Sequence, residues 1–202
     1  MLTKPNTLRL VFFLAAFAGA LYYPVREVLA FERPKVPPAE MRFKVRGYDP
    51  YDPMRGHYLQ LQVQSVIKMP PRKVKKLSRL FRNGRAEFAA VLKTKKDGFA
   101  EAVALYPLRR MPEGKTFVKV ARVSFFDREK DSHCTVFLPF DKYFINEKLA
   151  KDAEGLLQNV TRDKNHSAVL VVNVYADGRY AVKELLVDDK PVLSLLRPEP
   201  KR

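Results

Sequence analysis

The strongest signals of the fold are in two stretches: residues 88–106 read FAAVLKTKKDGFAEAVALY, and residues 169–187 read VLVVNVYADGRYAVKELLV. Each contains an Asp-Gly pair, Asp97-Gly98 or Asp177-Gly178, between two runs rich in aliphatic residues. Asp-Gly favours the tightest hairpin turns, because glycine readily adopts the positive φ that these turns require. Both stretches are therefore predicted to form antiparallel β-hairpins.

The strand pattern continues outside the two hairpins. Leu59, Leu61 and Val63 alternate with more polar residues, and this period of two predicts a half-buried strand. Further strands are predicted at residues 117–126, at residues 133–140 and, after a turn at Asp188-Asp189, near Val192 and Leu193.

One segment has a clear helical period. Asn146 can cap a helix in which Leu149, Ala153, Leu156, Leu157 and Val160 share one face. A second helix is predicted at residues 72–82. The expected class is mainly β (β-rich α+β): an antiparallel curved sheet, barrel or sandwich with a packed helix. No internal repeat is visible beyond the doubled Tyr-Asp-Pro triplet at residues 48–53.

The N-terminus carries an uncharged run, Leu10 to Val25, flanked by Arg9 and Arg26. Three interpretations are open: an uncleaved signal-anchor, a cleaved signal peptide with small-residue patterns near Ala18, and a buried core helix. The first two place the following domain outside the cytoplasm. The favoured prediction is a single-pass protein of the cytoplasmic (inner) membrane with a periplasmic domain, and the alternative is a soluble periplasmic protein.

This prediction sets the domain limits. Residues 1–28 are the signal-anchor helix, and residues 29–40 are a proline-rich stalk, because prolines favour an extended spacer. Residues 41–197 are the β-rich domain, and residues 198–202 are a basic tail.

The composition is strongly basic. The chain has 202 residues and a formal net charge of +16, with 47% hydrophobic and 30% charged residues. These fractions are typical of a globular protein rather than a disordered one. A charge of this size attracts polyanions, which here means either an anionic membrane surface or nucleic acid.

The segment from Arg46 to Val63 reads RGYDPYDPMRGHYLQLQV. It resembles the bacterial family named for its Gly-Asp-Tyr-x-x-Leu-x-Tyr signature: Gly56, Tyr58 and Leu61 match, whereas His57 replaces the family's Asp and the final Tyr is missing. The residues before the predicted helix, Tyr143 to Glu147, and those from Gly178 to Leu185 are also similar to this family. The resemblance implies a membrane-anchored protein, often encoded beside a multi-span membrane protein, and implies no activity.

The signature segment has three physical interpretations. Asp49-Pro50 and Asp52-Pro53 are turn-forming pairs, and Gly56 permits a tight bend, so the segment can deliver a strand into the sheet. Alternatively, Asp49, Asp52 and His57 converge as metal ligands or as an acid–base pair. The third interpretation is a ligand groove lined by Tyr48, Tyr51 and Tyr58.

A basic cluster without any acidic residue is the most distinctive surface feature. Its spacing of three and four residues places several cations on one helix face, beside an apolar stripe of Val74, Leu77, Leu80 and Phe81. It is either a solvated helix face, an amphipathic segment that lies on anionic headgroups, or a nucleic-acid surface. The cluster comprises Arg72, Lys73, Lys75, Lys76, Arg79, Arg82 and Arg85.

Other chemistry has little support in the sequence. His57, His133 and His166 are far apart, no cysteine lies at zinc-site spacing, and Cys134 is the only cysteine, with the pattern of a small buried residue. No cofactor, metal or catalytic residue is predicted. The first hypothesis is a membrane-tethered accessory domain that partners an integral membrane protein. The alternatives are a basic β-barrel that binds nucleic acid, and a metal- or carboxylate-dependent enzyme around Asp49, Asp52 and His57.

Overall fold

The computed structural model describes residues 4–34, 36–47, 58–82, 87–128, 131–163 and 166–196. The chain divides into two compact units, Met1–Pro37 and Pro38–Arg202. The first unit contains helix α1 (Lys4–Glu32). The second contains β1 (Ala39–Gly47), β2 (Tyr58–Gln62), β3 (Gln64–Lys68), α2 (Pro71–Arg82), β4 (Phe88–Thr94), β5 (Ala100–Pro107), the 3-10 turn η1 (Leu108–Arg110), β6 (Phe117–Lys119), β7 (Arg122–Arg128), β8 (Asp131–Phe137), β9 (Lys142–Phe144), α3 (Glu147–Arg162), β10 (Ala168–Val174), β11 (Tyr180–Val187), β12 (Lys190–Pro191) and α4 (Val192–Leu196).

Helix α1 is long and apolar enough to cross a membrane. The apolar stretch is Arg9–Leu29, which has 21 residues, none of them buried. About twenty residues suffice for the hydrocarbon core of a bilayer. This agrees with the prediction that the chain begins with an anchor or a signal sequence, since either one has such a helix.

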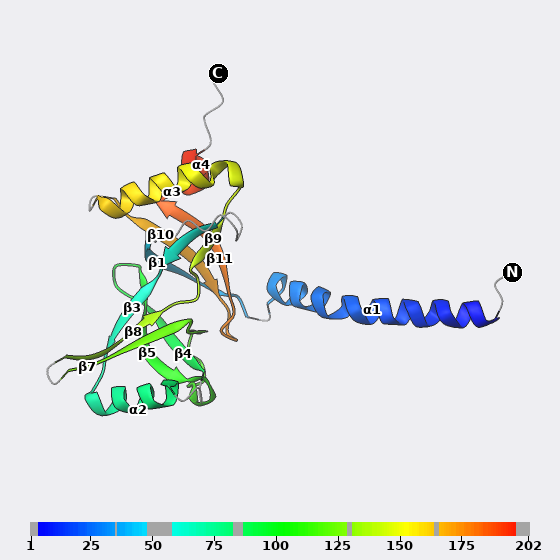
Figure 1. Ribbon diagram of the computed structural model, residues 1–202, viewed down its shortest axis with the longest axis horizontal. Helices are drawn as coiled ribbons and strands as arrows, with labels where there is room; N and C mark the ends of the chain where they lie inside the picture. Colours follow the sequence, from blue (N-terminus) through cyan, green and yellow to red (C-terminus); the bar gives the residue numbers. More distant parts are fainter. Residues whose placement is uncertain are drawn as a thin grey trace, which may run out of the picture. The chain divides into compact units, whose positions relative to one another are not determined.

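The second unit is built from antiparallel sheets, as predicted. One sheet has six strands in the order β12-β11-β10-β1-β2-β9, and two smaller sheets have the orders β3-β8-β7 and β5-β4-β6. In the described part of the chain these sheets do not close into a barrel. Helices α3 and α4 lie at one end of the unit, against the six-stranded sheet, and α2 lies at the other end (Figure 1).

A bent two-stranded ribbon joins the sheets. The predicted single strand at residues 58–64 is interrupted at Val63, so that β2 belongs to the large sheet and β3 to a small one. Opposite it, residues 138–141 separate β8 in the small sheet from β9 in the large one. Two hydrogen bonds span the bend: the N–H of Leu61 donates to the carbonyl of Asp141, and that of Leu138 donates to the carbonyl of Val63. The bend lets one ribbon serve two sheets.

Two further predictions need correction. Residues 117–126 were expected to form one strand, but β6 pairs with β4 whereas β7 pairs with β8, so the segment turns between sheets. The expected last strand near Val192 and Leu193 is instead helix α4. Asp188 (φ 48°) and Asp189 (φ 60°) form the predicted turn, but β12 ends at Pro191, which has no N–H to extend a ladder.

The domain contains a structural repeat that the residue pattern of the sequence does not show. In each half, a strand leads into a helix and then into an Asp-Gly hairpin: β3, α2, β4 and β5 in the first, β9, α3, β10 and β11 in the second. The hairpins correspond with a shift of 80 residues, because β4 begins at Phe88 and β10 at Ala168. Their turns place Gly98 and Gly178 at φ 81° and 83°. The helices also end 80 residues apart, at Arg82 and Arg162.

Finer details of the two hairpins agree. Each has a bulge at the corresponding point, between Val91 and Leu92 or between Val171 and Val172. Each base is closed in the same way: the N–H of Leu108 donates to Glu87, and the N–H of Asp188 donates to Ser167. We call residues 39–107 the first repeat and residues 117–187 the second repeat.

The two repeats are interlocked through their strands. Strand β10 of the second repeat pairs with β1 of the first, and β4 of the first pairs with β6 of the second. The bent ribbon follows the same rule, since β2 pairs with β9 and β3 pairs with β8. Each sheet therefore needs strands from both repeats.

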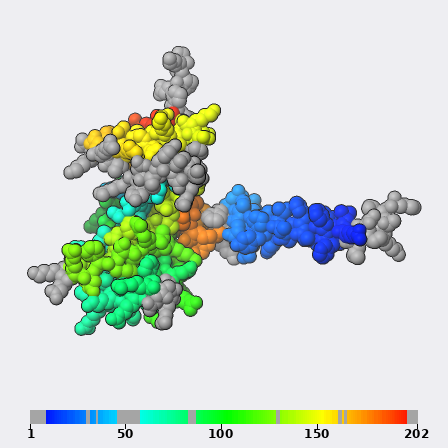
Figure 2. Space-filling view, in the orientation of Figure 1, coloured from blue at the N-terminus to red at the C-terminus, as the bar shows by residue number. Residues whose placement is uncertain are grey.

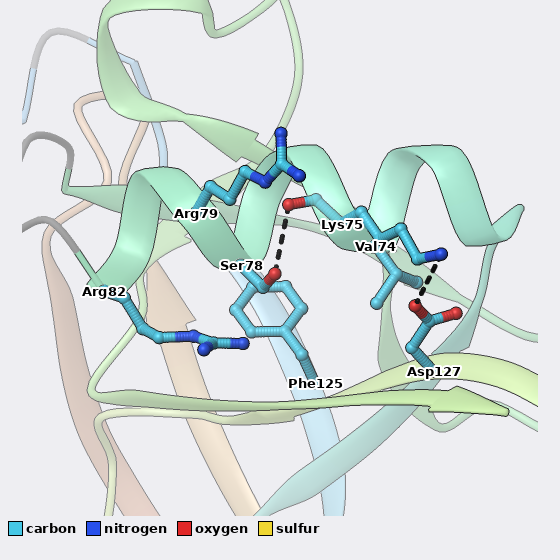
Figure 3. A pocket seen from close by; sticks show the side chains of 7 residues that line it. All are labelled: Val74, Lys75, Ser78, Arg79, Arg82, Phe125 and Asp127. Carbon is cyan, nitrogen blue, oxygen red and sulfur yellow. Dashed lines mark hydrogen bonds and ion pairs between the residues drawn. The ribbon is translucent and has the colours of Figure 1, made fainter.

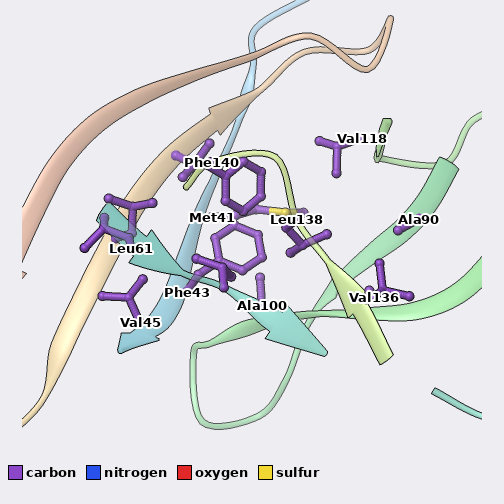
Figure 4. Packing of buried hydrophobic residues seen from close by; sticks show 14 of the residues in the cluster. Met41, Phe43, Val45, Leu61, Ala90, Ala100, Val118, Val136, Leu138 and Phe140 are labelled. Atoms are coloured by element: carbon purple, nitrogen blue, oxygen red, sulfur yellow. The ribbon is translucent and has the colours of Figure 1, made fainter. Parts of the chain in front are cut away.

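A single hydrophobic core lies where the repeats meet (Figure 4). Phe43 on β1 and Phe140 after β8 are each 1% exposed, and their ring centroids are 4.8 Å apart. Tyr180 extends this cluster: its ring lies 5.3 Å from that of Phe140, and its hydroxyl donates to the carbonyl of Pro139 at 2.9 Å. The alternation of buried residues along β1 (Met41, Phe43, Val45) is the signal that could have predicted this strand from its start at Ala39.

Candidate functional site

Most of the signature segment lies outside the described residues, including Asp49, Asp52, Gly56 and His57. Its end forms β2. Leu61 is 2% exposed and packs in the core, as does Val63, which occupies the final position of the signature. Tyr58 points to the other face, where its ring lies 6.1 Å from that of Phe144 on β9 and 4.9 Å from the Lys142 ammonium group. The proposed site of Asp49, Asp52 and His57 therefore stays a prediction from the sequence.

The basic cluster forms the outer face of α2, with the exception of Arg85, which lies outside the described residues. The other six cations are all exposed, and α2 has no acidic residue. The helix lies on the surface of the domain (turquoise in Figure 2). These cations, Arg72, Lys73, Lys75, Lys76, Arg79 and Arg82, are called the basic face below.

The apolar stripe of α2 points into the domain. Val74 is 1% exposed and Leu77 is 5% exposed, and both belong to the core. Phe81 is 39% exposed and contacts two rings, those of Phe88 (5.9 Å) and Phe125 (6.0 Å). The apolar stripe therefore packs against the core and cannot insert among lipid headgroups. Any contact of α2 with a membrane depends on its charged residues.

Some cations of the basic face have partners and others do not. The Lys75 ammonium lies 3.7 Å from a carboxylate oxygen of Asp127, and the Lys73 ammonium lies 5.5 Å from the centre of the Tyr106 ring. Within the described part of the chain, Arg79 and Arg82 have neither an ion pair nor a side-chain hydrogen bond. These two guanidinium groups are therefore available to an external anion.

A pocket of about 410 Å³ opens between α2 and β7 (Figure 3). Lys75, Ser78, Arg79 and Arg82 line it from the helix, and Phe125 and Asp127 line it from the strand. Ser78 is buried, and its hydroxyl donates to the Lys75 carbonyl at 3.1 Å. The pocket thus combines an aromatic wall with an excess of positive charge.

No group of three or more potential metal-binding side chains occurs among the residues that the structure describes. His133 pairs with Asp131 at 3.2 Å, and His166 pairs with Asp188 at 2.5 Å, at separate places in the domain. Cys134 is fully buried, as its pattern predicted, and burial raises the pKa of its thiol to about 11. A thiol of this kind is inert at neutral pH, because the thiolate is the reactive form.

These features define a class: a chain with an apolar helix long enough to span a membrane, followed by an interlocked β-rich domain with one strongly basic helix. Within that class, the chain belongs to the GDYXXLXY family, described as GDYXXLXY protein, whose sequence model matches residues 28–185. The match covers both repeats almost completely and confirms the resemblance seen around Tyr58. No curated protein and no solved structure matches the chain.

Proposed function

We propose that this protein is a membrane-tethered, extracytoplasmic accessory domain that contacts anionic headgroups through the basic face of α2 and partners an integral membrane protein. One observation carries the proposal: α2 and α3 hold equivalent places in the two repeats, yet only α2 is uniformly basic. Helix α2 has six basic and no acidic residues, whereas α3 has three of each.

The fold does not require the charges of α2. Helix α3 packs against the six-stranded sheet through Ala153, Leu157 and Val160, with balanced charge on its surface. On α2, Arg72 and Lys76, like Lys75 and Arg79, are four residues apart, and each such like-charge pair costs about 0.2–0.5 kcal/mol. A helix that departs from the usual charge pattern at a cost in stability is typical of a functional surface.

The length of the connection supports contact with the membrane that holds α1. Only residues 33–38 separate the end of α1 from the start of β1. Six extended residues reach about 20 Å at most. A domain on so short a tether stays close to the bilayer, where each basic residue gains roughly 1 kcal/mol from an anionic surface. Tethering also makes the contact intramolecular, so weak attraction suffices.

Site-specific fluorescence tests the headgroup contact. In a Cys134→Val background, Lys76→Cys on α2 and Lys151→Cys on α3 give matched, exposed labelling positions. The full chain is placed in nanodiscs of anionic or neutral lipid that carry a headgroup quencher. We expect quenching at position 76 in anionic nanodiscs, reversed by salt, and little quenching at position 151. Equal quenching at both positions would contradict the proposal.

Sidedness needs its own measurement. An alkaline phosphatase fused to the C-terminus is active only outside the reducing cytoplasm, so we expect an active fusion. An inactive fusion would place the domain inside the cell and favour the nucleic-acid alternative, to which the net charge of +16 is also suited. Crosslinking from positions 76 and 151 in native membranes, followed by mass spectrometry, would then test the integral membrane partner.

A further inference from the structure

We propose that the pocket between α2 and β7 binds a phosphomonoester. This inference rests on the proposed function, because it assigns one specific site to the basic face of the tethered domain. The helical period brings Lys75, Ser78, Arg79 and Arg82 to the side of α2 that borders β7, and Figure 3 shows all four around the pocket.

The charges that line the pocket are not balanced. Lys75, Arg79 and Arg82 contribute three positive charges, and Asp127 contributes one negative charge. Asp127 lies 3.7 Å from Lys75 and accepts a hydrogen bond from Ser132 at 3.2 Å, so no carboxylate of the described residues pairs with Arg79 or Arg82. Guanidinium groups bind phosphate through pairs of parallel hydrogen bonds. Two free guanidinium groups suit the three terminal oxygens and the double charge of a monoester better than the two oxygens and single charge of a diester.

The size and the walls of the pocket indicate an organic ligand. A volume of about 410 Å³ is larger than a phosphate group and lies in the range of small-molecule sites. Val74 and the Phe125 ring supply an apolar wall beside the cations. The ligand is therefore a phosphomonoester attached to an apolar or partly apolar group, carried either by a lipid headgroup or by a free phosphorylated compound.

The second repeat shows that this pocket is not an automatic product of the fold. With the shift of 80 residues, Lys75, Ser78 and Arg79 correspond to Gly155, Gln158 and Asn159 on α3. None of these three residues carries a charge. Only Arg82 has a charged equivalent in the sequence of α3, Arg162, so three of the four polar side chains that α2 contributes to the pocket have no counterpart in the second repeat.

Titration calorimetry of the full chain in uncharged detergent tests the site. The probes are a short-chain phosphatidic acid (lipid monoester), a short-chain phosphatidylglycerol (lipid diester) and glycerol 3-phosphate (free monoester). The variant R79Q/R82Q removes two pocket cations, and R72Q/K76Q removes the same charge from the same helix outside the pocket. We expect R79Q/R82Q to weaken phosphatidic acid binding about tenfold or more, and R72Q/K76Q to weaken it less than about threefold.

A lysine variant and the comparison of the probes distinguish the possible results. R79K/R82K keeps the charge but removes the planar donors, and we expect it to lose most of the preference for monoester over diester. Binding of glycerol 3-phosphate as tight as that of the lipid would indicate a free ligand, and much weaker binding would indicate a headgroup; either result supports the monoester site. Equal losses in the two glutamine variants, with no monoester preference, would overturn it. Proximity of position 76 to anionic lipid would then still stand, so failure of this site differs from failure of the proposed function.

Discussion

The two repeats of this domain each pack one helix against a sheet, but the exposed face is uniformly basic on α2 and balanced in charge on α3. Helix α3 follows the rules for a stable helix: Asn146 caps it by accepting from the N–H of Lys148 at 3.0 Å, and Glu147 lies in its first turn. Helix α2 departs from these rules, because Arg72 and Lys73 lie in its first turn, next to the positive end of the helix dipole. The comparison separates what the fold needs, a buried stripe, from what it does not need, a uniformly basic face.

The largest effects are expected in the core. Leu105 and Leu185 are equivalent, each is completely buried, and each pairs with an equivalent residue, Ala90 or Leu170. We expect Leu105→Ala and Leu185→Ala each to lower the free energy of unfolding by about 2–5 kcal/mol, because both leave a cavity in the same shared core. Urea denaturation followed by circular dichroism measures this. A loss below about 1 kcal/mol for only one of them would show that the repeats do not contribute equally.

The two hairpin turns should differ in how well they tolerate an added side chain. Gly98 and Gly178 both have φ near +80°, a region that costs an alanine about 1 kcal/mol. An added Cβ at Gly98 meets nothing within 4 Å, whereas at Gly178 it would lie 2.5 Å from the Phe117 ring. We therefore expect Gly98→Ala to destabilise the domain by about 1 kcal/mol and Gly178→Ala by about 2 kcal/mol or more. Adding Phe117→Leu to Gly178→Ala is the control, and it should remove the difference.

The helix starts should respond in opposite directions. Asn146→Ala removes the cap of α3, and we expect a loss of about 1 kcal/mol. Arg72→Glu places a negative charge at the start of α2 and removes a like-charge neighbour of Lys76, so we expect a gain of about 0.3–1 kcal/mol. Thermal unfolding of both variants measures the two effects. A destabilised Arg72→Glu variant would mean that the first turn of α2 has a structural role that its contacts do not reveal.

The smallest effect is a pH dependence of the His166–Asp188 pair in the second repeat. The hydrogen bond and charge of Asp188 raise the pKa of His166, and hydrogen bonds from Ser167 and His166 lower the pKa of Asp188. The histidine contribution is complete below about pH 6.5 and is lost as pH rises through its raised value. The aspartate contribution is present above about pH 4 and is lost as pH falls through its lowered value. The pair is therefore strongest between about pH 4 and 6.5.

Leu108, the equivalent of Asp188 in the first repeat, cannot titrate, so it provides an internal control. After correction for intrinsic rates, we expect the protection of the Asp188 amide from hydrogen exchange to depend on pH. The protection of the Leu108 amide should not depend on pH. An NMR titration should show a lower His166 pKa in Asp188→Asn. An unchanged His166 pKa would contradict the contact.

The sequence predicted the elements that depend on local chemistry. Both Asp-Gly hairpins, the Asn146 cap and the α2 helix are confirmed, because turn residues and apolar periods act within a few positions. The breaks at Val63 and between β6 and β7 were missed, since an alternating apolar pattern continues through a bend that serves two sheets. The repeat was missed for a similar reason: its halves share spacing and burial, while residues such as Lys75 and Gly155 share no chemistry.

The basic cluster was visible in the sequence, but the pocket was not. Phe125 and Asp127 lie more than forty residues from the helix that they face, and no local pattern brings them there. The sequence likewise could not show which cations are neutralised. Asp127 was one acid among 22 Asp and Glu residues until the fold placed it beside Lys75.

The sequence alone was enough to predict the membrane-length apolar helix, the two hairpins and the strong positive charge, because hydrophobicity, turn preference and charge are properties of single residues or short runs. The tertiary structure was needed to show that the apolar stripe of α2 packs inward and that, among the described residues, Arg79 and Arg82 have no ion pair. Burial and ion pairing depend on distant segments that meet in space, and in this domain those segments come from the interlocked second repeat.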